Sequence, residues 1–124
     1  MSRALLVISH GSRREASNTE VKTLTDKLAA FTKDRFDFIE AAFLELAEPS
    51  IPAGIKTCVD KGATQITIIP YFLAAGRHVA EDIPEIVDAA RPDYTDIEIT
   101  IAPHIGQSDF MAEFVANTAI SSVK

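Results

Sequence analysis

Residues 64–73, TQITIIPYFL, are the stretch that decides the fold. Branched and aromatic side chains dominate this run, and they favour a strand. After a turn of small residues, Ile83, Ile86, Val87 and Ala90 recur at the spacing of one helix face. The segment therefore predicts a buried strand followed by an amphipathic helix.

The start of that helix carries a capping signal. Asp82 and Glu85 stand three residues apart around Pro84, the spacing at which two side chains satisfy the free amides of a first helical turn. We expect these residues to form a capping box and the helix to continue to Arg91 and Pro92.

The same alternation of strand and helix extends to both sides. Apolar runs of strand length alternate with segments of helical periodicity, and prolines, glycines and polar residues separate them. The expected strands cover residues 4–9, 36–45, 64–73 and 97–102, and the expected helices about 15–33, 49–62, 82–91 and 109–121. Four alternating units predict an α/β fold, an open parallel sheet with helices on both faces. Right-handed crossovers favour the strand order 2-1-3-4.

Composition limits the classes of function. The chain has 124 residues, 47% of them hydrophobic and 24% charged, which predicts one globular domain over residues 1–124. A net charge of −6 argues against a nucleic-acid partner. Its apolar runs are too short to span a membrane, and residues 4–8 are too short for a signal core.

Cysteine usage suggests the compartment. The only cysteine, Cys58, cannot form a disulfide within the chain, which suits the reducing cytoplasm. It lies at an apolar position of an expected helix, so we expect it in the core and not as a nucleophile.

Polar residues collect where the expected strands end. His10, Glu45, His78 and His104 each follow a different strand, and ligands of open α/β sheets bind at such carboxyl ends. In the order 2-1-3-4, His10 and His78 leave adjacent strands about 4.8 Å apart, with Glu45 on the other flank. Two imidazoles and a carboxylate suit a borderline divalent cation such as Co²⁺, Fe²⁺ or Ni²⁺.

Other interpretations of these residues remain open at this point. The histidines could be ordinary surface or capping residues. Gly11 and Ser12 could form a phosphate-binding turn, although no Walker lysine or GxGxxG run accompanies them. Ser12 beside His10 could be nucleophilic, but no GxSxG elbow occurs. A receiver-like domain would need acidic residues after the first strand, which the chain lacks.

Together the segments resemble a known family. VISHGSRREASN, FLELAEPSIPAGI, GATQITIIPYFLAAGRHVAEDIP and IAPHIG are similar to the CbiX-type sirohydrochlorin cobaltochelatases, which are small class II tetrapyrrole chelatases. The pieces cover every expected strand exit and follow the family order. The resemblance implies a chelatase-like fold and insertion of a divalent metal into sirohydrochlorin or a related tetrapyrrole.

The resemblance also assigns roles to residues. It implies that His10, His78 and Glu45 are catalytic and handle the metal, which is a substrate and not a tightly bound cofactor. Co²⁺ is the expected metal, with Fe²⁺ and Ni²⁺ as alternatives, and the product would feed cobalamin, sirohaem or a nickel tetrapyrrole. The tetrapyrrole is expected to contact Ser12, Arg13, Arg14, Phe72, Leu73, Gly76 and Arg77. His104 is expected to matter less than the other two histidines.

Assembly is the last implication of the resemblance. Longer relatives carry two such units, so this single unit looks like the short form, which is expected to pair as a homodimer. We expect Phe72, Leu73, Ala74 and Ala75 at the inner edge of that interface, although burial in the core is the alternative for them. A non-catalytic tetrapyrrole or metal carrier of the same fold is the alternative function.

Overall fold

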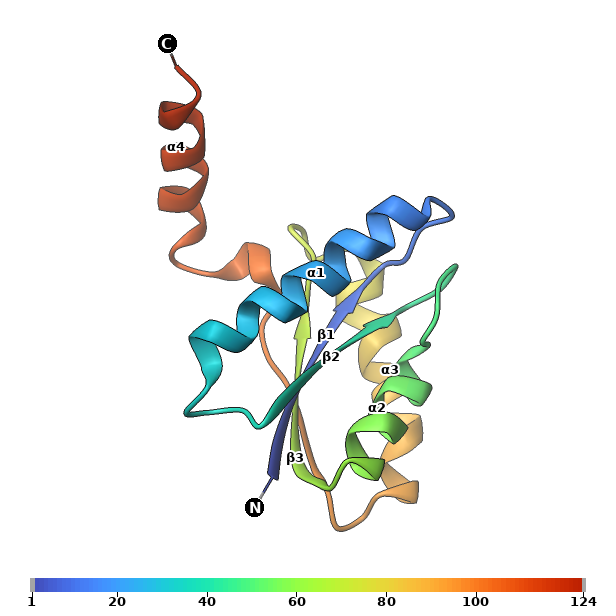
Figure 1. Cartoon of the computed structure of the whole chain (residues 1–124). Helices are drawn as coiled ribbons and strands as arrows, with labels where there is room; N and C mark the ends of the chain where they lie inside the picture. The colour runs from blue at the N-terminus through green and yellow to red at the C-terminus, as the bar shows by residue number, and fades with distance from the viewer. Residues whose placement is uncertain (1, 124) are drawn as a thin grey trace.

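A computed structural model describes residues 2–123 and places a parallel sheet at the centre of the molecule (Figure 1). The strands are β1 (Ser2–Ser9), β2 (Phe38–Phe43), β3 (Ala63–Pro70) and β4 (Glu98–Ile101). Their order is β2-β1-β3-β4 and every neighbouring pair is parallel. The predicted fold class and strand order are therefore confirmed.

Helices connect the strands. The α-helices are α1 (Glu15–Thr32), α2 (Ile51–Asp60), α3 (Ile83–Ala90) and α4 (Met111–Ser121). Three shorter elements are the π-helix η1 (His78–Asp82) and the 3₁₀-helices η2 (Arg91–Asp93) and η3 (Ile105–Gln107). None of the helices within residues 2–123 combines the length and the apolar character needed to cross a membrane.

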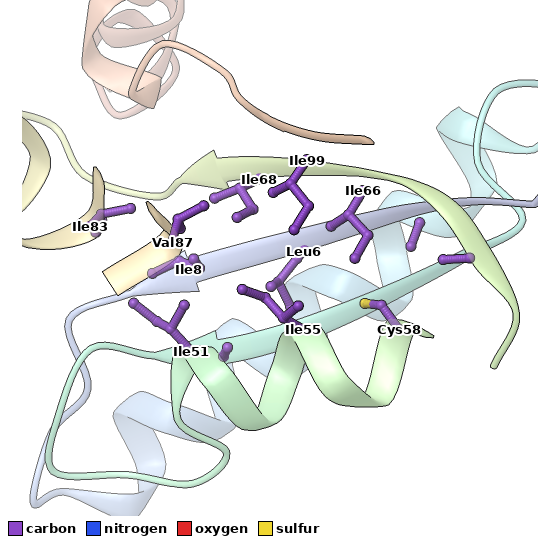
Figure 2. Close-up of a cluster of buried hydrophobic side chains, with 13 residues drawn as sticks. Leu6, Ile8, Ile51, Ile55, Cys58, Ile66, Ile68, Ile83, Val87 and Ile99 are labelled. Atoms are coloured by element: carbon purple, nitrogen blue, oxygen red, sulfur yellow. The ribbon is translucent and has the colours of Figure 1, made fainter. Parts of the chain in front are cut away.

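The larger core lies between the sheet and the helices α2 and α3. Leu6 and Ile8 of β1 meet Ile55 of α2 and Val87 of α3 in this cluster, as Figure 2 shows. Each of these side chains is fully buried. Successive strand residues point to opposite faces, so Leu5 and Val7 of the same strand enter the smaller cluster beneath α1. Burial on both faces explains why β1 is an unbroken apolar run.

Cys58 confirms its predicted place in the core. The side chain is fully buried in the larger cluster, and burial raises the pKa of its thiol to about 12. The thiolate is the reactive form of cysteine, so the thiol is inert near neutral pH.

The predicted capping box is wrong. Asp82 has helical backbone angles and makes no capping hydrogen bond, because η1 runs directly into α3 and places Asp82 inside a continuous helical segment. A working cap occurs instead at α2, where Ser50 Oγ accepts a hydrogen bond from the backbone N–H of Ala53 at 3.3 Å.

The last helix was predicted at about the right position, but it does not close the sheet. All described residues of α4 are partly or fully exposed, and in Figure 1 the helix (red) projects away from the sheet. Only α1 covers its face of the sheet, whereas α2 and α3 share the other. Coverage of the α1 face is therefore incomplete.

Candidate functional site

The exits of β1 and β2 lie in direct contact. The backbone N–H of Glu45 donates to the carbonyl oxygen of His10 at 3.0 Å, which extends the strand pairing by one step. Gly11 has a φ of +94°, and a Cβ atom there would lie 1.8 Å from the carbonyl oxygen of Glu45. Only glycine combines this backbone conformation with so close an approach. Gly11 thus brings the side chains of His10 and Glu45 together.

The ring of His10 is oriented by the backbone. Its Nδ1 lies 2.8 Å from the carbonyl oxygen of Gly11, and because a carbonyl can only accept, Nδ1 carries the proton of the neutral ring. Nε2 then presents a lone pair, 3.2 Å from Oε2 of Glu45. A lone pair and a carboxylate oxygen repel each other unless a proton or a cation lies between them. The pair is therefore built to receive a positive charge.

His78 approaches His10 from the exit of β3. The two ring centroids lie 4.9 Å apart with planes tilted by 58°, which confirms the predicted convergence of two histidines from adjacent strands. His78 begins η1, and its Nδ1 lies 2.8 Å from Oδ2 of Asp82. Because the carboxylate accepts a hydrogen bond from Nδ1–H, Nε2 of the neutral His78 ring is also left with a free lone pair.

Asp82 is a residue of the site that sequence reasoning missed. It follows His78 by four residues, which puts both side chains on one face of a helical segment. That signal was present in the sequence. The predicted capping box instead placed the start of the helix at Asp82, which would leave His78 outside it. In the structure the helical segment begins at His78.

Acidic side chains surround the histidine of η1. A hollow of about 260 Å³ lies between the exit of β2 and the η1–α3 segment, and Glu45, His78, Asp82 and Glu85 contribute its polar wall. Larger hollows lie along α1 and beside the exit of β4. The small hollow is the one that adjoins the paired imidazoles.

The side chains do not form a closed metal cage. Within residues 2–123, no three or more His, Cys, Asp or Glu residues are arranged to hold a metal ion. His10 instead takes part in two pairs, one with Glu45 and one with His78. The three-ligand set of His10, His78 and Glu45 stays a prediction.

Asn18 locks the turn after His10 and was also missed. Its Oδ1 accepts from the backbone N–H of Ser12 at 2.9 Å, and its Nδ2 donates to the carbonyl oxygen of Ser12 at 2.8 Å. Ser12 Oγ accepts from the backbone N–H of Arg14 at 3.0 Å. The backbone N–H of Ser12 is therefore already hydrogen-bonded, which disfavours a phosphate-binding turn. The predicted contact of Ser12 with the substrate stays a prediction.

The predicted anion-binding arginines are on the surface. Arg13 and Arg14 are exposed beside the β1 exit. Arg77 is 80% exposed, and its Nε lies 3.3 Å from Oε2 of Glu81. Exposed pairs of this kind contribute little stability, so Glu81 is a weak competitor for the guanidinium. The predicted binding of substrate carboxylates by the three arginines stays a prediction.

The remaining predicted contacts differ in exposure. Phe72 packs partly against the larger core, whereas Leu73 is 75% exposed. Gly76 is exposed, and a Cβ atom there would meet nothing within 4 Å. Burial in the core, the alternative to an interface edge, thus applies to Phe72 in part but not to Leu73.

The exit of β4 braces the exit of β3. The backbone N–H of Gly106 donates to the carbonyl oxygen of Phe72 at 3.0 Å, and a Cβ atom on Gly106 would lie 1.7 Å from the carbonyl oxygen of Leu73. His104 is half-buried and lines a separate hollow with Ile69 and Ile105. It belongs to neither of the two pairs around His10.

Comparison with known proteins identifies relatives of one kind. The CbiX family model matches residues 4–122. A chloroplastic sirohydrochlorin ferrochelatase of Arabidopsis thaliana is 32% identical over 111 residues, which cover 90% of this chain and 48% of the relative. A sirohydrochlorin cobaltochelatase of Methanocaldococcus jannaschii is 40% identical over 86 residues, 68% of this chain and 57% of the relative.

Solved structures agree with this relationship. The sirohydrochlorin chelatase SirB from Bacillus subtilis subspecies spizizenii, solved in complex with cobalt, has a TM-score of 0.86 at 31% identity and covers 98% of this chain and 51% of its own. A putative cobalamin biosynthesis CbiX protein from Marinobacter aquaeolei VT8 has a TM-score of 0.78 at 26% identity, with 96% and 95% coverage. The chain thus spans about half the length of the curated relatives it matches.

Proposed function

Because the chain belongs to the CbiX family, we propose that it inserts a divalent metal ion into sirohydrochlorin. The observation that carries the proposal is the contact of His10 with both Glu45 and His78 at the strand exits. Relatives are named for cobalt and for iron. We propose Co²⁺ as the metal, with Fe²⁺ and Ni²⁺ as the alternatives to be compared.

His10 and Glu45 would receive the metal. Ligand atoms that are each about 2.1 Å from a cation stand about 3 Å apart when they meet at a right angle. The 3.2 Å between Nε2 of His10 and Oε2 of Glu45 is close to that separation. A site open on its remaining sides can release the metal to the substrate, whereas a closed cage would retain it.

His78 would accept protons. Insertion of M²⁺ into the macrocycle displaces two protons from pyrrole nitrogens, so charge balances when two protons leave as the metal enters. The free lone pair on Nε2 of His78 can accept one of them. Asp82, bonded to Nδ1 of His78 at 2.8 Å, would then stabilise the resulting imidazolium. Solvent can carry the protons away, because both side chains are partly exposed.

The charged periphery of the tetrapyrrole would meet the arginines. Sirohydrochlorin carries several carboxylates, and Arg13, Arg14 and Arg77 are exposed cations beside the two histidine-bearing exits. Arginine suits carboxylates because its fork can donate two parallel hydrogen bonds. Ser12, Phe72, Leu73 and Gly76 are the proposed neighbours of the ring itself.

The setting of the activity completes the proposal. We place the protein in the cytoplasm, where a free, buried Cys58 would stay reduced. It would need no tightly bound cofactor, because the metal is consumed as a substrate. We further propose a homodimer as the working unit, since a single sheet provides the exits on only one side of a large flat macrocycle.

An absorbance assay with sirohydrochlorin and each metal in turn tests the proposed reaction. We expect turnover with the wild-type protein and loss of most of it in His10→Ala and in His78→Ala. His104→Ala is the matched control, because it removes a histidine from a strand exit outside the two pairs. Circular dichroism should show an unchanged fold in all three variants.

Two outcomes contradict the assignment. Full insertion activity in His10→Ala or His78→Ala would exclude those rings from the reaction. Binding of sirohydrochlorin or metal by the wild-type protein without any turnover would instead favour the non-catalytic carrier.

A further inference from the structure

The helix α4 exposes an unusual amount of apolar surface. Phe114, Val115 and Ile120 are 58–68% exposed, and Phe110 at its start is 75% exposed. Successive helix positions turn by about 100°, so Phe114, Val115 and Ile120 point in three different directions. A helix that is apolar on several sides is normally buried. The helix therefore lacks its packing partner.

A second surface of the same chain lacks a partner as well. An apolar groove of about 350 Å³ opens beside α1 on the incompletely covered face of the sheet. Leu24 and Leu28 of α1 form one wall, Val7 and Ile69 form the floor, and Tyr71 and Ile105 form the other wall. No helix among residues 2–123 fills it. Its apolar walls require an apolar occupant.

Charge distinguishes between the possible occupants of the groove. The only charged residue in α4 is Glu113, so the helix lacks the basic face that attracts amphipathic helices to anionic lipid. The hollow that continues the groove along α1 shares Leu24 and Tyr71 with it and is lined by one acidic and one basic side chain, Glu20 and Lys27. Neither of the two makes an ion pair within the described part of the chain. The rim therefore carries no net charge, and an apolar helix with a single carboxylate, such as α4, suits it.

The connection to α4 directs the helix away from its own groove. Ile105 is part of the groove wall, and Gly106 is fixed against the backbone of Leu73. Hydrogen bonds then shape the short link: the N–H of Ser108 donates to the carbonyl of Ile105 at 3.0 Å, and that of Met111 to the carbonyl of Ser108 at 3.1 Å. Folding α4 back would break these bonds, whereas docking onto another molecule keeps them.

We propose that α4 of one copy of this chain occupies the groove of a second copy, and that the exchange is reciprocal. Such an arrangement is two-fold symmetric, with the same helix and groove used by both subunits. It rests on the homodimer put forward under the proposed function, and it names α4 as the element that makes the pair. It does not depend on the metal chemistry.

Light scattering or sedimentation at micromolar concentration tests the exchange. The wild-type protein should give about 27 kDa, twice the chain mass of 13.5 kDa. Phe114→Lys on the helix and Leu24→Glu in the groove should each give a species of single-chain mass. Phe31→Lys is the matched control: Phe31 is 85% exposed on α1 but does not line the groove, so that variant should remain dimeric.

Mixing the two disrupted variants identifies where α4 docks. A mixed pair keeps one intact joint, in which the unaltered helix of Leu24→Glu meets the unaltered groove of Phe114→Lys. We therefore expect dimers to reappear on mixing, while each variant alone stays monomeric. Monomers in the mixture would overturn the exchange, because a helix docked in its own groove gains nothing from a second chain. The circular dichroism spectrum of each variant should match that of the wild-type protein, which excludes unfolding as the cause of a monomeric mass.

Other results separate this proposal from the proposed reaction. A wild-type protein that stays monomeric, or that stays dimeric when Phe114 is replaced by Lys, overturns the exchange even if metal insertion proceeds. Co-sedimentation of a monomeric wild-type protein with anionic lipid vesicles also overturns it. A dimer that responds to both variants but inserts no metal supports the exchange and contradicts only the reaction.

Discussion

The exits of β1 and β3 deliver a histidine each, but they hold it by different means. At the β1 exit the ring of His10 is bonded to a backbone carbonyl, and the turn is fixed by Gly11 and the buried Asn18. At the β3 exit the ring of His78 is bonded to the side chain of Asp82, after a loop in which a side chain added at Gly76 would meet no other atom within 4 Å. The first orientation is a property of the fold, whereas the second depends on one side chain. Mutation of the residues that support each histidine should therefore lower stability at the first exit, and should impair function without loss of stability at the second.

Replacement of glycine gives the largest expected contrast between the exits. Gly11→Ala introduces a side chain at a φ of +94° and within 1.8 Å of a carbonyl oxygen, so the exits of β1 and β2 must separate. We expect a loss of about 3 kcal/mol or more in the free energy of unfolding, measured by urea denaturation, and loss of metal insertion.

Gly76→Ala is the matched control at the other exit. Nothing lies within 4 Å of the position that its Cβ would occupy, so we expect a change in unfolding free energy within about 0.5 kcal/mol. Equal destabilisation by the two alanines would remove the distinction between a rigid and an adaptable exit.

Asn18→Ala should have the next largest effect, again on stability. The substitution removes two hydrogen bonds to Ser12 and leaves the backbone groups of the turn without their partners. We expect unfolding to become easier by about 2 kcal/mol, as measured by urea denaturation. Thr95→Ala, at an exposed position outside α4, is the control. A neutral Asn18→Ala would mean that the turn is held without this side chain.

These contrasts also explain what the sequence could reveal. The sheet order follows from four alternating units and the right-handed crossover rule, and that order alone brings His10 and His78 onto adjacent exits. Gly11 could be recognised as a turn residue, but its approach to Glu45 depends on a neighbouring strand distant in sequence. The placement of the two histidines thus follows from the topology of the sheet, which the periodicity of the sequence predicts well.

Roles set by local alternatives were harder to predict. Asp82 fits a capping box and equally fits a pair with His78 four residues earlier, and the π-helix that decides between them has no evident sequence signal. Asn18 resembles any polar helix residue, because its partner lies in the preceding turn. The apolar content of α4 predicts that it is buried but does not identify the surface that buries it, so the helix was expected on its own sheet.

Asp82→Ala tests the side-chain support of the second exit. Mutation of a residue that orients a histidine of a metal site typically changes metal affinity or activity by tenfold or more. We therefore expect Asp82→Ala to lose about tenfold in metal insertion while its free energy of unfolding stays unchanged. Asp82→Asn should retain more activity, because its amide oxygen can still accept a hydrogen bond from the Nδ1–H of His78. Glu81→Ala is the control, since it removes an equal charge from the adjacent residue. A loss as large in that variant would indicate a general charge effect.

Arg77→Gln should have the smallest effect and the most selective one. The guanidinium is 80% exposed and its partner Glu81 is exposed as well, so its removal costs the fold almost nothing. If Arg77 binds a carboxylate of the tetrapyrrole, the KM for sirohydrochlorin should rise a few-fold while kcat and the affinity for Co²⁺ stay the same, because the interaction is made equally in the ground and transition states. Lys33→Gln, which removes the same charge at the far end of α1, should change none of these quantities. Parallel losses in metal affinity and in KM would assign Arg77 to the metal and not to the substrate periphery, and the two exits would then differ only in how they hold their histidines.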